Sequence, residues 1–279
     1  MRERKKVWFI TGASSGFGRA FALCALERGY QVVATARNAE KLASLAAESP
    51  DRVLPLKLDV TVESEVESAV SQAVAKFGRV DVLINNAGYG VVGAVEETPE
   101  SELRAMMETN FFGAVAVIRA LLPTMRKQGS GAIVNISSMG GQLSYAGYSA
   151  YSASKFALEG MSEALALELK PFGIKVLIVE PGAFRTEFAG TALKQMPAID
   201  AYAATVGNIR EFTRGMHETQ EGDPFKAAKA VEQALDAEET PLRLALGADA
   251  VNTIRGHSET LLAELAKWEK VGLNTKIDN

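Results

Sequence analysis

Cysteine is nearly missing from this chain, which has one in 279 residues. Cys24 therefore excludes an internal disulfide and favours a reducing compartment. The two histidines are too few and too far apart to indicate a metal site, so no metal is expected. No uninterrupted apolar run approaches the roughly 18 residues of a membrane span. The apolar residues 7–10 are too few for a signal peptide, so we expect a soluble cytoplasmic protein.

Runs of like charge are also missing. The net charge is −4 and the two signs are interspersed, which argues against nucleic acid or an acidic membrane surface as partner. The chain contains no Pro/Gly/Ser-rich linker, repeat or low-complexity stretch. With 47% hydrophobic residues it can bury a sizeable core. We therefore expect a single domain over residues 1–279.

Short apolar runs alternate with longer helical patterns, which predicts an α/β fold: a doubly wound parallel (Rossmann) sheet of about seven strands with helices on both faces. Two regions break this alternation. Residues 183–222 carry helical signals without a strand, and we expect a lid over a substrate pocket. Residues 248–272 predict a helix whose apolar stripe would dock on the body or on a partner subunit. The expected strands are 6–11, 31–36, 53–58, 80–85, 131–137, 174–180 and 242–246, and the expected helices lie near 16–28, 38–48, 62–77, 99–127, 149–170 and 223–237.

A glycine-rich turn joins the first expected strand to the first helix. Small residues let the backbone approach a pyrophosphate, and the helix N-terminus offers free N–H groups to it. The spacing is G-x3-G-x-G, which differs from the better-known G-x-G-x-x-G fingerprint. The alternative is a turn that binds no ligand, but its place at the start of an alternating chain favours a dinucleotide. The expected contacts are Gly12, Ser14, Ser15, Gly16, Phe17 and Gly18.

The end of the second strand bears on which dinucleotide binds. An acidic residue there would hydrogen-bond the adenosine ribose 2′-hydroxyl and repel a 2′-phosphate. This chain has Arg37 instead, whose guanidinium can pair with a 2′-phosphate. The sequence therefore predicts NADP(H) over NAD(H). The alternative is an ordinary solvated arginine.

Tyr151 and Lys155 are four residues apart, so a helix would place both on one face. A free tyrosine has a pKa near 10, and one positive charge about 4 Å away at an effective dielectric of about 20 supplies roughly 4 kcal/mol towards ionisation. The pair could thus exchange a proton with a carbonyl or an alcohol. Taken alone, the pattern could equally be two neighbouring surface residues.

These motifs together resemble the classical short-chain dehydrogenases/reductases over nearly the whole chain. The resemblance includes the glycine turn, Asn85-Asn86-Ala87-Gly88 after the fourth strand and Pro181-Gly182 after the sixth. It implies that Tyr151 is the general acid/base and that Lys155 lowers its pKa and holds the nicotinamide ribose. Ser138 would hydrogen-bond the substrate oxygen, and Asn110 would help to hold a water of a proton relay. Without the resemblance, Ser138 could be a strand-end cap and Asn110 a helix-kink residue.

The resemblance also implies further cofactor contacts. Asp59 and Val60 would contact the adenine, although Asp59 could also cap the next helix. Asn86, Ala87 and Gly88 would flank the adenosine ribose. Pro181, Gly182 and Thr186 would cover the nicotinamide. With Arg37, Tyr151 and Lys155, these residues complete the expected cofactor site.

The substrate is less well defined by the sequence. Aromatic and flexible apolar residues of the expected lid suit a bulky apolar carbonyl, or simply pack the lid onto the sheet. The resemblance points weakly to the hydroxysteroid and retinol dehydrogenase-like branch and implies a homodimer or homotetramer. Two alternatives are an NADPH-sensing regulator without turnover and a sugar epimerase or dehydratase. The expected substrate contacts are Ser138, Gln142, Tyr145, Tyr151, Phe184 and Phe188.

Overall fold

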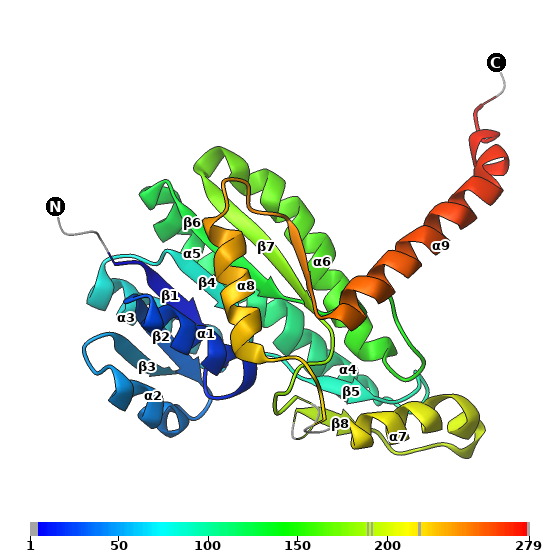
Figure 1. Cartoon of the computed structure of the whole chain (residues 1–279), viewed down its shortest axis with the longest axis horizontal. Coiled ribbons are helices and arrows are strands. Elements are labelled where there is room, and N and C mark those ends of the chain that lie inside the picture. The colour runs from blue at the N-terminus through cyan, green and yellow to red at the C-terminus, as the bar shows by residue number, and fades with distance from the viewer. Residues whose placement is uncertain (1–4, 189, 191, 217–218, 278–279) are drawn as a thin grey trace.

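The computed structural model describes residues 5–188, 190, 192–216 and 219–277. Its centre is a seven-stranded parallel sheet in the order β3-β2-β1-β4-β6-β7-β9, with helices on both faces (Figure 1). The predicted doubly wound fold is confirmed. The strands are β1 Val7–Ile10, β2 Gln31–Ala36, β3 Val53–Lys57, β4 Val82–Asn85, β6 Gly131–Ile136, β7 Ile174–Pro181 and β9 Arg243–Leu246.

The apolar strands are buried on both faces, and each face has its own core. Along β1, Trp8 and Ile10 belong to one core, whereas Val7 and Phe9 belong to the other. This alternation follows from the two-residue period of a strand. The first core is covered by α1 Gly16–Glu27, α2 Ala43–Glu48 and α8 Pro224–Asp236, and the second by α3 Glu63–Phe77, α5 Gly113–Gln128 and α6 Ser149–Leu169.

The topology determines where a ligand can bind. The chain builds the sheet outward from β1 through β2 to β3, then returns to β4 on the other side of β1. Connections therefore leave β1 and β4 in opposite directions, which opens a crevice at the carboxyl ends of these strands. The glycine-rich turn follows β1, and Asn86 follows β4.

The helical run Glu100–Gln128 is long and apolar enough to pass a length-and-composition test for a membrane span. It contains α4 Glu100–Met107, a π-helical segment η2 Glu108–Phe112 and α5. Val117, Leu121 and Met125 of α5 are fully buried against the sheet. Packing in the core thus accounts for part of the apolar character of this run, since 39% of its most apolar window is buried.

The structure of the lid differs from the prediction in one respect. The sequence indicated no strand between residues 183 and 222. The structure has β8 Leu193–Gln195 there, paired in parallel with β5 Gly90–Val92. Each strand has only three residues, too few for a periodic pattern to be recognised. After β8 the lid continues through two short helical turns, η5 Asp200–Tyr202 and η6 Ala203–Gly207, to α7 Asn208–Gly215. Positions 189, 191, 217 and 218 of the predicted lid lie outside the described residues.

The C-terminal helix α9 Ala248–Leu273 projects away from the body (Figure 1). Ala250, in its first turn, is buried, whereas Leu261, Leu265 and Trp268 are 51–67% exposed. Docking of this stripe on the body is therefore wrong. Docking on a partner subunit stays a prediction.

Candidate active site

The glycine-rich turn forms a backbone cradle between β1 and α1. Gly12 and Gly16 have positive φ values of 67° and 50°. A Cβ on Gly18 would lie 2.2 Å from the Gly12 carbonyl oxygen, so only glycine fits there. Asn86 Nδ2 donates to the carbonyl oxygens of Thr11 and Gly12 at 2.9 and 3.1 Å, which fixes the turn.

The N-terminus of α1 also fits a phosphate. Ser15, at its N-cap, makes no side-chain capping hydrogen bond. The first N–H groups of the helix thus remain available at the positive end of its dipole. Together with the space left by the three glycines, this geometry fits the pyrophosphate of a dinucleotide.

Three residues predicted for the adenosine end lie at the ends of β2 and β3. Arg37 is exposed directly after β2. Asp59 Oδ1 accepts from the backbone N–H and the hydroxyl of Thr61 at 3.0 and 2.7 Å. Asp59 thus stabilises the turn before α3. The alternative role as a helix cap is wrong, because the N-cap of α3 is Val62 and it has no side-chain capping hydrogen bond. The adenine contact stays a prediction. Val60 is buried against Gly113 of α5, where a Cβ would lie 2.5 Å from Val60 Cγ2.

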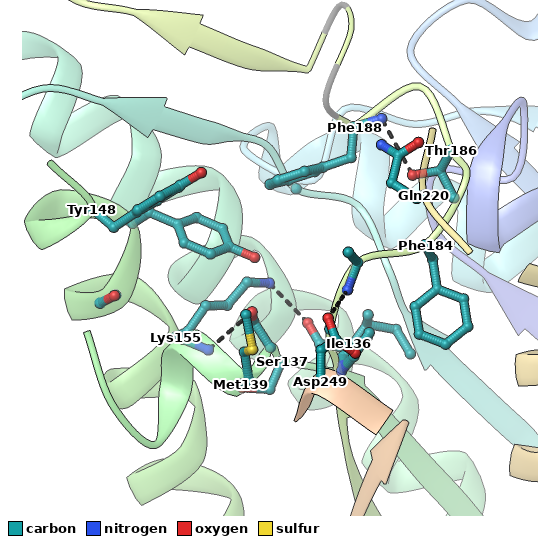
Figure 2. A pocket seen from close by; sticks show the side chains of 18 of the residues that line it. Ile136, Ser137, Met139, Tyr148, Lys155, Phe184, Thr186, Phe188, Gln220 and Asp249 are labelled. Carbon is teal, nitrogen blue, oxygen red and sulfur yellow. Dashed lines mark hydrogen bonds between the residues drawn. The ribbon is translucent and has the colours of Figure 1, made fainter. Parts of the chain in front are cut away.

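Strand β6 and helix α6 bring together the predicted Ser138, Tyr151 and Lys155. Ser138 follows β6, while Tyr151 and Lys155 lie in the first two turns of α6 and are more than 90% buried. Lys155 Nζ donates to the Ile136 carbonyl oxygen at 2.8 Å (Figure 2) and lies 5.7 Å from the centroid of the Tyr151 ring. Ser138 Oγ accepts from Gly140 N at 3.0 Å.

Burial dominates the acid–base properties of this group. Burial raises the pKa of Tyr151 to about 12, although the hydrogen bond with Ser138 works in the opposite direction. Burial also lowers the pKa of Lys155 to about 8, opposed by the nearby Glu159 carboxylate. The Lys155 ammonium donates to the Ile136 carbonyl oxygen, and burial is the largest influence on both pKa values. That Lys155 lowers the pKa of Tyr151 stays a prediction.

Asn110 lies in the π-helical segment η2 and is buried. Its Nδ2 donates to the Tyr89 carbonyl oxygen at 2.9 Å and to Ser154 Oγ at 3.0 Å, and its Oδ1 accepts from Tyr89 N at 3.1 Å. The side chain thus ties α6 to the segment after β4. A Cβ on Gly88 would lie 3.0 Å from Asn110 Oδ1 and 3.8 Å from Lys155 Nζ, so both groups border Gly88. A water relay between them stays a prediction.

A cavity of about 450 Å³ lies above this group (Figure 2). Its lining includes Asn86 and Gly88 as well as the nicotinamide-side residues Pro181, Gly182 and Thr186 predicted from the sequence. Ser138, Tyr151 and Lys155 form part of its polar lining. The remaining surface is mainly apolar, as the lid composition predicted, and part of it is aromatic. Its aromatic residues include Phe17, Tyr145, Tyr148, Phe184, Phe188 and Phe212.

Gln142 was predicted to contact substrate, but it lies outside the lining of the cavity. Its Nε2 donates to Glu180 Oε1 at 2.8 Å and to Glu159 Oε2 at 3.5 Å. Arg243 reaches the same two carboxylates at 3.1 and 3.2 Å. Burial raises the pKa of Glu159 to about 7 and that of Glu180 in the same direction. The prediction is wrong because the Gln142 amide points to the buried carboxylates of Glu159 and Glu180 and not into the cavity.

Sequence reasoning missed several polar residues of the cavity, among them Asp249 and Gln220. Asp249 Oδ2, in the first turn of α9, accepts from Ala183 N at 2.7 Å (Figure 2). A Cβ on Gly182 would lie 2.2 Å from the Asp249 carboxylate, so this close approach requires glycine. Both residues come from segments with no recognisable motif, and only the folded chain brings them to the site.

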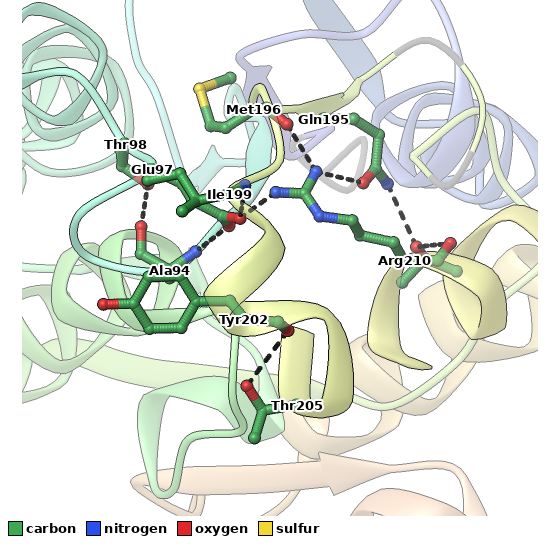
Figure 3. A network of polar contacts seen from close by, with 10 residues as sticks. Ala94, Glu97, Thr98, Gln195, Met196, Ile199, Tyr202, Thr205 and Arg210 are labelled. Carbon is green, nitrogen blue, oxygen red and sulfur yellow. Dashed lines mark hydrogen bonds and ion pairs between the residues drawn. The ribbon is translucent and has the colours of Figure 1, made fainter. Parts of the chain in front are cut away.

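A buried ion pair fixes the lid to the body (Figure 3). Arg210 of α7 donates to Glu97 Oε2 at 2.7 Å and to the Met196 carbonyl oxygen at 2.6 Å. Glu97 also accepts from the N–H groups of Ala94 and Ile199, both at 2.7 Å. Burial alone would raise the pKa of Glu97, but these backbone donors and the Arg210 guanidinium outweigh it and hold the pKa below its usual value.

Comparison with known proteins agrees with this site. A short chain dehydrogenase family model matches residues 6–197, which include the glycine turn, Ser138, Tyr151 and Lys155. Oxidoreductase BOA17 of Botryotinia fuckeliana is 42% identical over 269 residues, covering 96% of this chain and 98% of that protein. A 3-ketodihydrosphingosine reductase of Bacteroides thetaiotaomicron is 49% identical over 183 residues, covering 66% and 65%.

Solved structures give the same result. The crystal structure of a short-chain dehydrogenase from Streptomyces avermitilis superposes with a TM-score of 0.93 at 54% identity, covering 98% of this chain and 100% of that one. A Burkholderia phymatum short-chain dehydrogenase/reductase in complex with NAD (TM-score 0.82, 25% identity, 95% and 97% covered) and a Burkholderia cenocepacia one with NADP (0.74, 30%, 96% and 98%) are also similar. This chain therefore belongs to the classical short-chain dehydrogenase/reductase family of oxidoreductases.

Proposed function

We propose that this oxidoreductase uses NADP(H) to interconvert a bulky apolar ketone or aldehyde and the corresponding alcohol. The observation that carries the proposal is the meeting of Ser138, Tyr151 and Lys155 in one cavity with largely apolar walls, beside a glycine cradle. A proton donor, a second hydroxyl and an ammonium there suit a substrate oxygen. The apolar walls suit the remainder of the substrate.

In this mechanism Tyr151 acts first as an acid. With its pKa raised to about 12, the phenol is protonated at neutral pH and can donate to a carbonyl oxygen. Ser138 would hydrogen-bond the same oxygen as negative charge develops on it. Lys155, held by the Ile136 carbonyl, stabilises phenolate formed when the proton leaves. A bound nicotinamide dinucleotide would supply or accept the hydride.

The preference for NADP(H) rests on the end of β2. The family includes complexes with NAD and with NADP, so membership alone does not decide between them. In this chain Thr35 and Ala36 precede Arg37, and no carboxylate occupies the strand end. An exposed guanidinium there favours a 2′-phosphate over a bare 2′-hydroxyl.

The substrate class rests on the cavity. One relative is named a 3-ketodihydrosphingosine reductase, and that name gives a ketone as the substrate of the relative. A ketone with a large apolar part would also match the aromatic lining in this protein. The hydroxysteroid and retinol dehydrogenase-like branch stays a prediction, since its substrates share the same property.

The proposal is tested by NADPH consumption over a panel of small, aromatic, long-chain and steroid-like ketones, with NADH alongside. We expect turnover of a bulky ketone with NADPH. Tyr151→Phe should lower this turnover at least about a hundredfold, a size typical for lost acid–base help, while NADPH binding persists. A variant that keeps most of its activity would refute the role of Tyr151. Tight binding without turnover would favour the regulator, and product without net NADPH consumption would favour the epimerase or dehydratase.

A further inference from the structure

Gln142 lies outside the cavity lining, at the end of a short helical turn that begins beside the cavity. This turn is η3 Met139–Gly141, with Ser138 at its N-cap and Gln142 at its C-cap. Ser138 Oγ accepts from Gly140 N at 3.0 Å. Because that bond uses a lone pair of the hydroxyl, its O–H remains free to donate to a ligand. The direction of this donor therefore depends on where η3 lies.

The far end of η3 is attached to the protein core by the Gln142 side chain. Its Nε2 donates to Glu180 Oε1 at 2.8 Å. Glu180 of β7 is 2% exposed, and Arg243 of β9 pairs with the same oxygen at 3.2 Å. A hydrogen bond to an ionised carboxylate is stronger than one between neutral groups, and losing it leaves a buried acceptor short of a donor. Gln142 thus fastens η3 to two strands of the central sheet.

The turn has little room between α6 residues on either side of it. A Cβ on Gly141 would lie 2.9 Å from Glu159 Cγ, so η3 packs closely against Glu159. A Cβ on Gly140 would lie 3.4 Å from Tyr151 Cε1 and equally far from Ser138 Oγ. The turn therefore fills the space between Glu159 and the Tyr151 ring. A displacement of η3 would change how Ser138 faces Tyr151.

We propose that Gln142 is a positioning residue that, through η3, directs the Ser138 hydroxyl at the substrate oxygen beside Tyr151. Negative charge develops on this oxygen during reduction, and a donor stabilises it only at hydrogen-bond distance and in the right direction. A turn released from Glu180 would leave Ser138 chemically intact but poorly directed. The effect belongs to the transition state, so it should appear in kcat. This inference rests on the proposed function, because it assumes that Ser138 donates to a substrate oxygen.

The test is a double-mutant cycle of Gln142→Met and Ser138→Ala, with NADPH and the panel ketone that the wild type reduces best. Loss of one oxyanion donor typically costs about a hundred- to a thousandfold in kcat, and we expect a misdirected donor in Gln142→Met to cost about tenfold. KM and NADPH affinity should stay within about twofold. In the Ser138→Ala background, Gln142→Met should change kcat less than about twofold, because the group through which it acts is gone.

Gln128→Met is the matched control for loss of an amide anchor. Gln128 ties α5 to the segment before β4, donating to the Val80 carbonyl oxygen at 2.9 Å and accepting from Val80 N at 3.1 Å. These bonds lie at the amino ends of the strands, whereas the cavity lies at their carboxyl ends. The control should therefore keep kcat within about twofold of the wild type, because changes distant from the site act independently of it.

Other outcomes would overturn the inference. Equal fractional losses from Gln142→Met in both backgrounds would mean that it acts independently of Ser138. A raised KM at unchanged kcat would make Gln142 a substrate contact, and an equal loss in Gln128→Met would reduce the effect to general destabilisation. If Gln142→Met does not fold, Gln142→Asn, whose amide is one methylene too short to reach Glu180, replaces it in the cycle. A wild type that reduces no ketone of the panel would instead refute the proposed function, on which the inference rests.

Discussion

In the proposed function, the choice between NADP(H) and NAD(H) depends on Arg37. Arg37→Asp would remove a charge-assisted hydrogen bond to a 2′-phosphate and place a carboxylate where a 2′-hydroxyl can donate to it. Hydrogen bonds to charged groups contribute about 1.5–3 kcal/mol, so we expect the KM for NADPH to rise about ten- to a hundredfold while that for NADH falls. Steady-state kinetics with both coenzymes measure this. Arg255→Asp, on the projecting α9, is the control for charge reversal, and an unchanged NADPH/NADH ratio in Arg37→Asp would remove the assignment.

Glu159 makes stability depend on pH. Its pKa is raised to about 7 by burial, so between the usual carboxylate pKa and pH 7 the folded protein holds a proton that the unfolded chain has lost. Stability contributed by this proton is present at low pH and is lost as pH rises to about 7. In the wild type the unfolding free energy should decrease from pH 5 to pH 8. In Glu159→Gln we expect this decrease to be smaller, by on the order of 1–3 kcal/mol. Urea unfolding at both pH values measures it.

The control for this prediction is Glu163, a second carboxylate that pairs with Arg243, the partner of Glu159. Glu163 pairs with Arg243 Nη2 at 2.6 Å, but its side chain is 55% exposed. Glu163→Gln should therefore leave the pH dependence nearly unchanged, because an exposed ion pair contributes little. An equal effect of both substitutions would show that Arg243, rather than the buried carboxylate, determines the pH response.

The lid depends on the ion pair between Glu97 and Arg210, which links the segment after β5 to α7. Arg210→Met would leave the Glu97 carboxylate buried without its cation, and such losses are typically about 3–5 kcal/mol. Because Ile209 and Phe212 of α7 line the cavity, the substrate KM should rise while NADPH affinity changes little. Urea unfolding and kinetics measure the two effects. Combining Arg210→Met with Glu97→Gln should recover part of the stability, since it removes the unpaired buried charge while the amide oxygen still accepts from one of the two backbone donors. A double variant no more stable than Arg210→Met would contradict this account.

At the scale of elements, the sequence predicts what has a regular period and misses what does not. The seven strands of the large sheet were predicted because each is a short, mainly apolar run between helices, for example Ile174–Pro181. The strands β5 and β8 were not, because three residues pairing across about a hundred positions leave no local signal. Motif order correctly indicated that Ser138, Tyr151 and Lys155 would come together, and the structure places them in one cavity. Gln142 was misplaced because its direction depends on the carboxylates of Glu159 and Glu180, which reach it from other elements.

At the scale of the whole molecule, only the beginning of α9 lies at the active site, and the rest of the helix is far from it. The first turn belongs to the site, because Asp249 holds Ala183 beside the cavity. The distal part extends into solvent, with Leu261, Leu265 and Trp268 more than half exposed. An isolated helix of this length is only marginally stable in water. The first turn is therefore expected to affect the site and the distal turns to affect neither core nor chemistry.

Removal of residues 258–279 tests this division. We expect the unfolding free energy to change by less than about 1 kcal/mol, as for other exposed groups, and kcat/KM to stay within about twofold. Asp249→Ala in the full-length chain should lower kcat/KM, because it removes the acceptor that holds Ala183 N–H beside the cavity. Since this hydrogen bond is exposed, the unfolding free energy should fall by only about 0.5–1.5 kcal/mol. Urea unfolding and kinetics of the two variants provide the comparison. The contrary outcome is that the truncated chain loses activity and that light scattering shows fewer subunits in the assembly. The apolar stripe would then be an interface between subunits on which the site depends, because no described contact within one chain links these turns to the cavity.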